Sequence, residues 1–182
     1  MYHIQGDKRV HASVELITKA LLELLAEKPF SRITVTDLQQ RSTVSRSTFY
    51  RSFDRPEDVL AYLCDRGFET AMRKAEPNAQ ALGVAVFRYW MENTAVLEAL
   101  VEVRRTDILL ASLRRSLSRA QGFTSLSDSA AENDYFVSIV TSVMTGILTT
   151  WIEHGKRETP EAVFERVSAA MASAIPLVAG WD

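Results

Sequence analysis

Apolar residues recur at helical spacing along most of the chain. Between residues 8 and 27 they follow one another at intervals of three and four, which gathers them on one face of an amphipathic helix: Val10, Val14, Ile17, Leu21, Leu24 and Leu25. Asp7 is placed to cap the start of this helix, and Pro29 ends it.

Two short helices joined by a tight turn are predicted next. Thr34 with Asp37 three positions later forms a capping-box pattern, so a helix is expected to begin at Val35. The run RSTVS interrupts it, and Ser45 is placed to cap the following helix, with Thr48 at its third position. Two capped helices around a short turn are typical of a helix-turn-helix.

The second of these helices has two unlike sides. Phe49 and Phe53 are four residues apart, so both point inward with Val44, and the other side keeps Arg46, Ser47, Tyr50 and Arg51. A helix-turn-helix lays its second helix in the DNA major groove, where an arginine near the helix start can bond guanine. From Gln39 to Phe53 there are three arginines and no acid, the local charge that phosphate binding requires. The alternative interpretation is an ordinary solvated helix face.

The rest of the chain is expected to be helical as well. A fourth helix begins near Pro56 and runs to about Glu76, and helical patterns cover 79–93, 95–103, 105–120, 134–154 and 160–178, whereas 121–129 resembles a linker. Glycine and proline are scarce, at seven and five residues, which favours helices over turn-rich β folds. The predicted fold class is therefore all-α, with about nine helices.

Charge is distributed unevenly along the chain. Residues 1–55 contain nine Lys or Arg and six Asp or Glu, a net charge of +3, while residues 56–182 contain 12 and 17, a net charge of −5. A basic first third on an acidic remainder predicts two separate tasks, the first of which involves a polyanion.

Other functional classes find little support in the composition. No apolar run reaches 18 residues, so neither a membrane span nor a membrane partner is expected. The single cysteine, Cys64, can form no internal disulfide, which fits a reducing cytoplasm. The phosphate-binding, nucleophile-elbow and zinc-protease motifs are missing, and the three histidines are His3, His11 and His154, near a terminus or a helix end. We therefore expect no catalytic residue, metal or cofactor, and a small helical enzyme is a remote alternative.

The stretch ITVTDLQQRSTVSRSTFYRSF resembles the DNA-binding segment of the TetR (TetR/AcrR) family of bacterial transcriptional regulators, and the resemblance covers about residues 8–63 by motif. It implies that Thr34 caps the second helix and touches phosphate, and that Arg46 and Ser47 face bases. The full set of expected DNA-binding residues is Thr34, Arg41, Ser45, Arg46, Ser47, Thr48, Tyr50, Arg51 and Arg55.

Three places depart from the family pattern. Gln39 stands where a small residue is usual, and Ser42-Thr43 stands where Ala-Gly is usual. Pro56 replaces a frequent phosphate-binding lysine, with Arg55 beside it to compensate. A left-handed conformation at Thr43 would cost on the order of 1 kcal/mol. These changes bear on the DNA target and the turn geometry rather than on the fold.

The resemblance also implies a second domain, so we expect a DNA-binding domain over 1–55 and an effector-binding and dimerisation domain over 56–182. Methionine and aromatic side chains suit a small, largely apolar effector. The candidate pocket residues are Phe87, Trp90, Met91, Tyr135, Phe136, Val140, Met144 and Ile147. The alternative is that these side chains only fill the core.

The last two predicted helices are the expected dimer interface, where Ala169, Ala170 and Ser173 permit close helix approach and Trp151 supplies bulk. A two-fold homodimer would set two recognition helices roughly 34–36 Å apart on a palindromic operator in double-stranded DNA. The predicted function is a cytoplasmic, homodimeric repressor that its effector releases from the operator. The alternative is a DNA-binding regulator that has no small-molecule pocket and is controlled by a protein partner.

Overall fold

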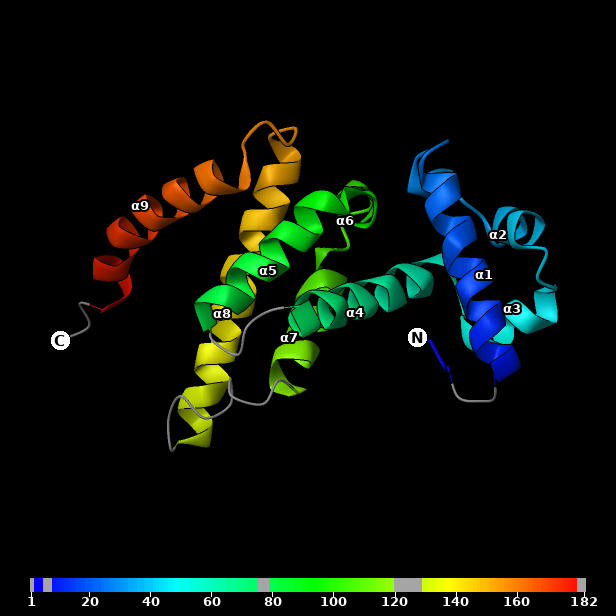
Figure 1. The fold of residues 1–182 in the computed structure, drawn as a ribbon, viewed down its shortest axis with the longest axis horizontal. Coiled ribbons are helices and arrows are strands. Elements are labelled where there is room, and N and C mark those ends of the chain that lie inside the picture. The colour runs from blue at the N-terminus through cyan, green and yellow to red at the C-terminus, as the bar shows by residue number, and fades with distance from the viewer. Residues whose placement is uncertain (1, 5–7, 75–78, 120–128, 180–182) are drawn as a thin grey trace.

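The computed structural model describes residues 2–4, 8–74, 79–119 and 129–179. Across these ranges the chain forms nine α-helices and one 3-10 helix, and an isolated antiparallel β-bridge joins Tyr2 to Phe53. The helices gather in two groups that α4 (Pro56–Lys74) connects, as Figure 1 shows. The all-α prediction is confirmed. The expected cap at Asp7 and the expected linker up to residue 128 lie outside the described residues.

The first group, which we call the head, contains α1 (Lys8–Leu25), the 3-10 helix η1 (Phe30–Arg32), α2 (Val35–Ser42) and α3 (Arg46–Ser52). The capping box at Thr34 and the Ser45 cap place α2 and α3 where the sequence predicted them. Helix α1 ends two residues earlier than its apolar pattern suggested.

The head has a small apolar core. Ile17 and Leu21 of α1 and Leu38 of α2 are fully buried, and so are Phe49 and Phe53. Their complete burial confirms that the two phenylalanines point inward, and their ring centroids lie 5.8 Å apart. Burial of each ring contributes about 2 kcal/mol to the free energy of unfolding, so this pair fixes the orientation of α3.

The second group, which we call the body, contains most of α4 together with α5 (Ala79–Glu92), α6 (Thr94–Glu102), α7 (Thr106–Arg119), α8 (Ala130–Glu153) and α9 (Pro160–Ala179). Helix α4 packs on α5 and α7, and α7 packs on α8. Helix α9 projects to the far end of the molecule and contacts the body through its first half (Figure 1). Gly155, with φ of +75°, ends α8 as its sequence predicted.

The body has its own core around α4. Phe68 of α4 packs edge-on against Trp90 of α5, with 5.1 Å between ring centroids. Gly67 permits this approach, because a β-carbon at that position would come within 2.8 Å of the Trp90 ring. Cys64 is also fully buried here, and burial raises the pKa of its thiol.

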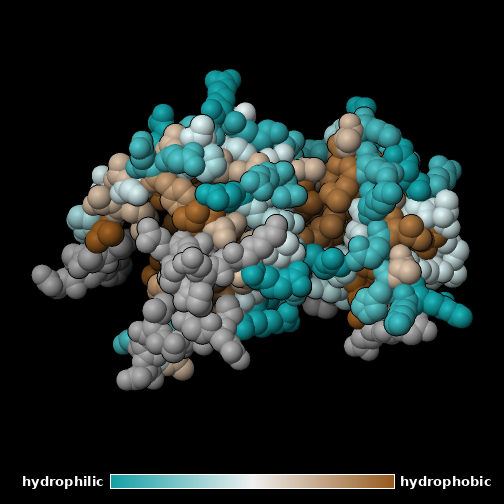
Figure 2. Space-filling view, in the orientation of Figure 1, coloured by the Kyte–Doolittle hydropathy of each residue, from teal (hydrophilic) through white to brown (hydrophobic). Residues whose placement is uncertain are grey.

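Helix α8 carries apolar surface that the chain leaves uncovered. Its most apolar window has a mean hydropathy of 1.5, yet only 28% of that window is buried. Tyr135 and Ile139 are 75% and 59% exposed, and Ile175 on α9 is 52% exposed. By length and composition alone α8 could cross a membrane, but the core helices of soluble proteins pass the same test, so this is weak evidence. Figure 2 shows further apolar surface between the head and the body.

Thr43 ends α2 in the left-handed region, with φ of 58° and ψ of 14°. Because a β-branched side chain is strained there, we expect Thr43→Gly to raise the free energy of unfolding by about 1 kcal/mol. Urea denaturation would measure this, with Thr36→Gly inside α2 as the matched control. Because threonine is itself a weak helix former, Thr36→Gly should lower the free energy of unfolding by roughly 0.3 to 0.5 kcal/mol. The same change in stability at both positions would contradict the strain.

Candidate nucleic-acid interface

Helix α2 begins at a complete capping box. The Asp37 amide donates to Thr34 Oγ1 at 3.2 Å, and the Thr34 amide donates to Asp37 Oδ2 at 2.8 Å. Lys28 Nζ lies 2.8 Å from the other oxygen of Asp37. These bonds, that from Lys28 first, lower the pKa of Asp37 to about 2. The start of α2 is thereby tied to the segment that follows α1, and Thr34 itself stays exposed.

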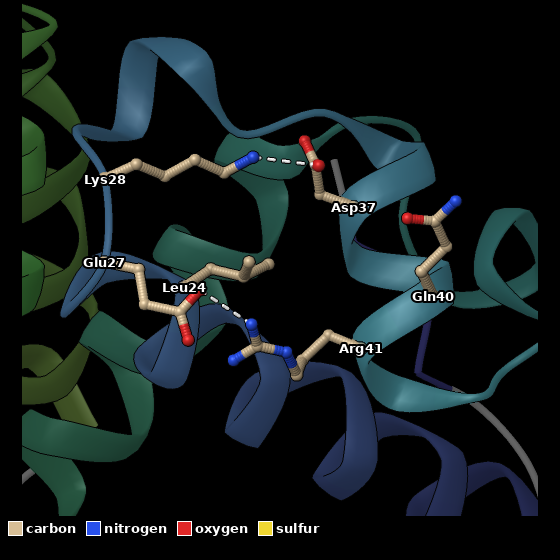
Figure 3. A pocket seen from close by; sticks show the side chains of 6 residues that line it. All are labelled: Leu24, Glu27, Lys28, Asp37, Gln40 and Arg41. Carbon is tan, nitrogen blue, oxygen red and sulfur yellow. Dashed lines mark hydrogen bonds and ion pairs between the residues drawn. The ribbon is translucent and has the colours of Figure 1, made fainter.

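A hollow of about 480 Å³ lies between the C-terminal end of α1 and α2, and four of its six lining residues are charged. They are Leu24, Glu27, Lys28, Asp37, Gln40 and Arg41 (Figure 3). The Lys28–Asp37 pair closes one side. On the other side Arg41 Nη2 donates to Glu27 Oε2 at 2.7 Å, and Arg41 Nη1 lies 3.5 Å from Glu23 Oε2. These three pairs hold α2 against α1 and the segment that follows it.

Arg41 was expected to bind DNA, but in this structure it serves the contact between α1 and α2. To bind a DNA phosphate, the Arg41 guanidinium would have to give up its contacts with the carboxylates of Glu23 and Glu27. It would gain a single phosphate in their place. Its assignment to DNA therefore stays a prediction, and its observed role is to position α2.

The first turn of α3 is a cluster of hydroxyl groups. The Thr48 amide donates to Ser45 Oγ at 3.2 Å, which is the predicted cap. Ser45 Oγ also lies 2.8 Å from Thr48 Oγ1 and 3.1 Å from Ser47 Oγ. The cluster fixes where the helix starts, and Ser45 and Ser47 are exposed on it.

The outward face of α3 joins charge to an aromatic ring. The Arg46 guanidinium lies 5.5 Å from the centroid of Tyr50, and its Nη2 is 3.4 Å from the tyrosine hydroxyl. Tyr50 is 42% exposed, and Arg46 and Arg51 are exposed beside it. We call Ser45, Arg46, Ser47, Tyr50 and Arg51 the α3 face. It offers a guanidinium for a base edge and hydroxyl groups for phosphate oxygens.

Arg55 stands just beyond α3 at the start of α4. Its side chain is 58% exposed, and its Nε lies 3.9 Å from Asp58. The Asp58 carboxylate caps α4 by accepting from the amides of Asp54 at 3.0 Å and Arg55 at 3.2 Å. Arg55 is thus exposed enough to bind a phosphate, although the nearby Asp58 carboxylate partly offsets its positive charge.

The departures from the family pattern have a structural cost. The half-buried Gln39 has a buried Nε2 without a hydrogen-bond partner among the described residues, which costs about 1 to 3 kcal/mol. Ser42 is buried, and its Oγ accepts from the Val44 amide at 3.3 Å. Thr43 takes the left-handed conformation that the family pattern requires. The turn keeps its shape with residues that fit it less well.

The candidate pocket residues are distributed unevenly. Phe87, Trp90 and Met144 are buried, Met91, Phe136, Val140 and Ile147 are half-buried, and Tyr135 is largely exposed. Phe87 packs on Phe164 of α9, with 5.3 Å between centroids, and Trp90 packs on Phe68. The structure places Tyr135 outside the core that holds the buried members. The pocket assignment stays a prediction.

The candidate dimer residues divide in the same way. Ala169, Ala170 and Ser173 are exposed on α9. Trp151 is 6% exposed, and its Nε1 donates to the Glu158 carbonyl at 3.0 Å within the same chain. The bulk expected from Trp151 thus lies inside the subunit, and the exposed bulk on α8 comes from Tyr135 and Ile139.

One residue that joins body to head escaped the sequence analysis. Glu102, the last residue of α6, accepts from the amides of Phe30 at 2.8 Å and Ser31 at 3.2 Å, and from the Ser31 hydroxyl at 2.5 Å. An acid at a helix C-terminus interacts unfavourably with the helix dipole. The position of Glu102 at the end of α6 was therefore a sequence signal that it binds a group outside its own helix. Within the described ranges no group of three His, Cys, Asp or Glu could hold a metal.

Family comparisons place both parts of the chain. Residues 17–63 match the bacterial regulatory proteins of the tetR family, and residues 78–173 match a family described as the transcriptional regulator C-terminal region. The chain belongs to the TetR family. It is a transcriptional regulator with a DNA-binding helix-turn-helix, and the families and relatives that it matches are regulators rather than enzymes.

Two curated relatives match over different spans. The HTH-type transcriptional regulator YxbF of Bacillus subtilis (strain 168) is 24% identical over 169 residues, which is 87% of this chain and 44% of YxbF. The dhaKLM operon transcriptional activator DhaS of Lactococcus lactis subsp. lactis (strain IL1403) is 30% identical over 54 residues, 30% of this chain and 29% of DhaS. The sequence alignment thus spans less than half the length of either relative.

Solved structures share the fold. A TetR transcriptional regulator from Rhodococcus sp. RHA1 superposes with a TM-score of 0.65 at 14% identity, covering 92% of this chain and 98% of that one. The dihydroxyacetone kinase operon activator DhaS gives 0.61 at 18% identity, covering 91% and 97%. At these identities the likeness establishes the arrangement of helices alone.

The capping box yields a pH-dependent prediction. The lowered pKa of Asp37 means that its charge stabilises the head above about pH 4, and that this stabilisation disappears as the pH falls towards 2. We expect Asp37→Asn to destabilise the protein at pH 7 and to approach wild-type stability near pH 2. Chemical denaturation between pH 2 and pH 7 would measure the free energy of unfolding of both proteins. Asp134→Asn, at an exposed position of α8, is the control. A deficit that is constant with pH would refute the role of the charge.

Proposed function

We propose that the protein binds a palindromic operator as a homodimer and represses transcription until a small, largely apolar effector lowers its operator affinity. The observation that carries the DNA-binding part is the α3 face, which stands clear of the head core and contains no acid. We further propose the division at residue 55, with residues 56–182 sensing the effector and forming the dimer, and a cytoplasmic location where operator DNA is accessible.

Arg46 is the proposed base reader, because it is exposed in the first turn of α3 and has the geometry to bond guanine O6 and N7. We expect Arg46→Ala to weaken operator binding about 10- to 100-fold and binding to a scrambled duplex much less. Fluorescence anisotropy at one fixed salt concentration would measure both affinities.

Arg114→Ala is the matched control for this experiment, because Arg114 is an exposed arginine on α7 of the body. It should change neither affinity. An equal loss on both duplexes with Arg46→Ala would assign Arg46 to the phosphates instead.

The uncovered apolar residues of α8 and α9 support the dimer. Soluble chains rarely leave large aliphatic and aromatic side chains together on one helix unless a partner covers them. Tyr135 and Ile139 lie four residues apart on α8, so both point to the same side. A two-fold axis beside α8 and α9 would bury them against a second copy.

We expect Ile139→Glu to shift the protein from dimer to monomer at micromolar concentration, because the charge would be buried without a partner. Sedimentation velocity would measure the change. Leu22→Glu, at an exposed apolar position of α1 in the head, should leave the dimer intact. A monomeric wild-type protein would refute the homodimer, and a dimeric Ile139→Glu would place the interface elsewhere.

The proposal of an effector site is supported by the apolar side chains of the body and by one buried polar atom, Trp90 Nε1. Trp90 is buried, and its Nε1 has no hydrogen-bond partner among the described residues. Buried donors normally have an acceptor, so a mostly apolar ligand that carries one oxygen or nitrogen acceptor would complete this site.

A panel of apolar compounds with one acceptor should contain members that raise the melting temperature and lower operator affinity at the same concentration. Trp90→Phe should reduce the response to those compounds. If no compound shifts the melting temperature, the alternative of control by a protein partner is favoured. A promoter–reporter fusion would test repression, since the relative DhaS is named an activator.

A further inference from the structure

Residues Tyr2–Ile4, which we call the strap, lie against the C-terminal end of α3. Tyr2 forms the antiparallel bridge with Phe53, and the His3 amide donates to the Ser52 carbonyl at 2.9 Å. The His3 ring Nε2 is 3.0 Å from Asp54 Oδ1. The last carbonyl groups of a helix lack partners within it, so the strap supplies one to a helix of only two turns.

The side chain of Tyr2 points away from α3 and towards the body. Its ring packs edge-on against Tyr62 of α4, with 5.5 Å between centroids, and its hydroxyl donates to the Asp65 carboxylate. Asp65 is 12% exposed and also accepts from Arg115 of α7, at 2.8 and 3.1 Å. Arg115 donates in turn to Ser112 at 3.0 Å. Burial and the neighbouring carboxylate raise the pKa of Tyr2, so its hydroxyl keeps its proton and donates.

Tyr2 therefore contacts two elements directly: the end of the recognition helix through its backbone, and α4 through its side chain. It reaches α7 only through the Asp65–Arg115 pair. The Asp65–Arg115 pair bridges α4 and α7, two helices that pack closely in the body. A shift of α4 against α7 would alter this pair, and the Tyr2 hydroxyl would transmit the change to Ser52 and Phe53.

We propose that Tyr2 is a positioning residue for DNA recognition: it fastens the end of the recognition helix to the ion pair between α4 and α7. This inference rests on the proposed reading of an operator by the α3 face. Tyr2 itself contacts no DNA in this role. It defines the orientation in which the α3 face is presented.

The test is Tyr2→Phe, which removes the hydroxyl and keeps the ring on Tyr62. Asp65 retains Arg115, so the body stays folded. At 25 °C, with the variant fully folded by circular dichroism, we expect its affinity for the operator to fall at least 5-fold. The operator probe is the palindrome that the wild-type protein selects from random duplexes. The slope of log Kd against log salt should stay unchanged, because no phosphate contact is lost.

Tyr89→Phe is the matched control, because Tyr89 is a half-buried tyrosine of α5 outside this network. It should leave operator affinity unchanged. Arg115→Gln should weaken the operator in the same direction as Tyr2→Phe, and the double variant should lose less than the product of the two, because both side chains act on Asp65. Full additivity would overturn the proposal.

Hydrogen exchange without DNA separates this inference from the proposed function. Tyr2→Phe should accelerate exchange of the α3 amides and leave those of α8 unchanged. Operator affinity equal to wild type, together with a lower melting temperature, would reduce Tyr2 to a purely stabilising residue and overturn the proposal. A changed salt slope would mean direct DNA contact and would also overturn it. Failure of the wild-type protein to select any sequence would defeat the operator function, while the exchange result would still test the strap.

Discussion

A helix of seven residues is too short to be stable alone in water, and this constraint shapes the whole head. Helix α3 exists because Ser45 caps its start, because Phe49 and Phe53 fix its inner side and because the strap completes its end. The residues on its outer side are not needed to hold the helix in place. The α3 face can therefore carry residues chosen for DNA, while its position is determined by elements that touch no DNA.

The acids of the head are placed where they support the fold without neutralising the α3 face. Glu23 and Glu27 pair with Arg41, and Asp37 pairs with Lys28, all at the contact between α1 and α2. Asp58 accepts backbone amides at the start of α4. The net charge over residues 1–55 is only +3, but Glu23, Glu27 and Asp37 are paired at the contact between α1 and α2. Arg46 and Arg51 therefore still present positive charge outward.

Much of this fold could be predicted from local sequence, because helix ends depend on neighbours in the chain. Thr34, Ser45 and Gly155 each fixed a boundary through a bond or a backbone angle within a few residues. The inner and outer sides of α3 followed from the spacing of Phe49 and Phe53 for the same reason.

The sequence analysis could not reveal partners that are distant along the chain. No local pattern indicated that Arg41 pairs with Glu27 and Glu23, since these acids lie 14 and 18 positions earlier. The bond from Ser31 to Glu102 joins residues 71 positions apart, and the bond from Tyr2 to Asp65 joins residues 63 apart. No periodic pattern encodes such pairs, so the connections between head and body became visible only in three dimensions. The bulk of Trp151 was noticed correctly, but its burial inside the subunit depends on the turn after α8.

The buried Cys64 has a consequence of its own. It is the single cysteine of the chain, it directly precedes Asp65, and its thiol is fully buried with a raised pKa. A thiolate-seeking reagent can reach it only when α4 moves away from its neighbours, and oxidants are excluded in the same way. Cys64 can therefore report on motion at Asp65, the residue that the strap contacts. The rate at which its thiol is alkylated measures how often α4 separates from its neighbours at this point.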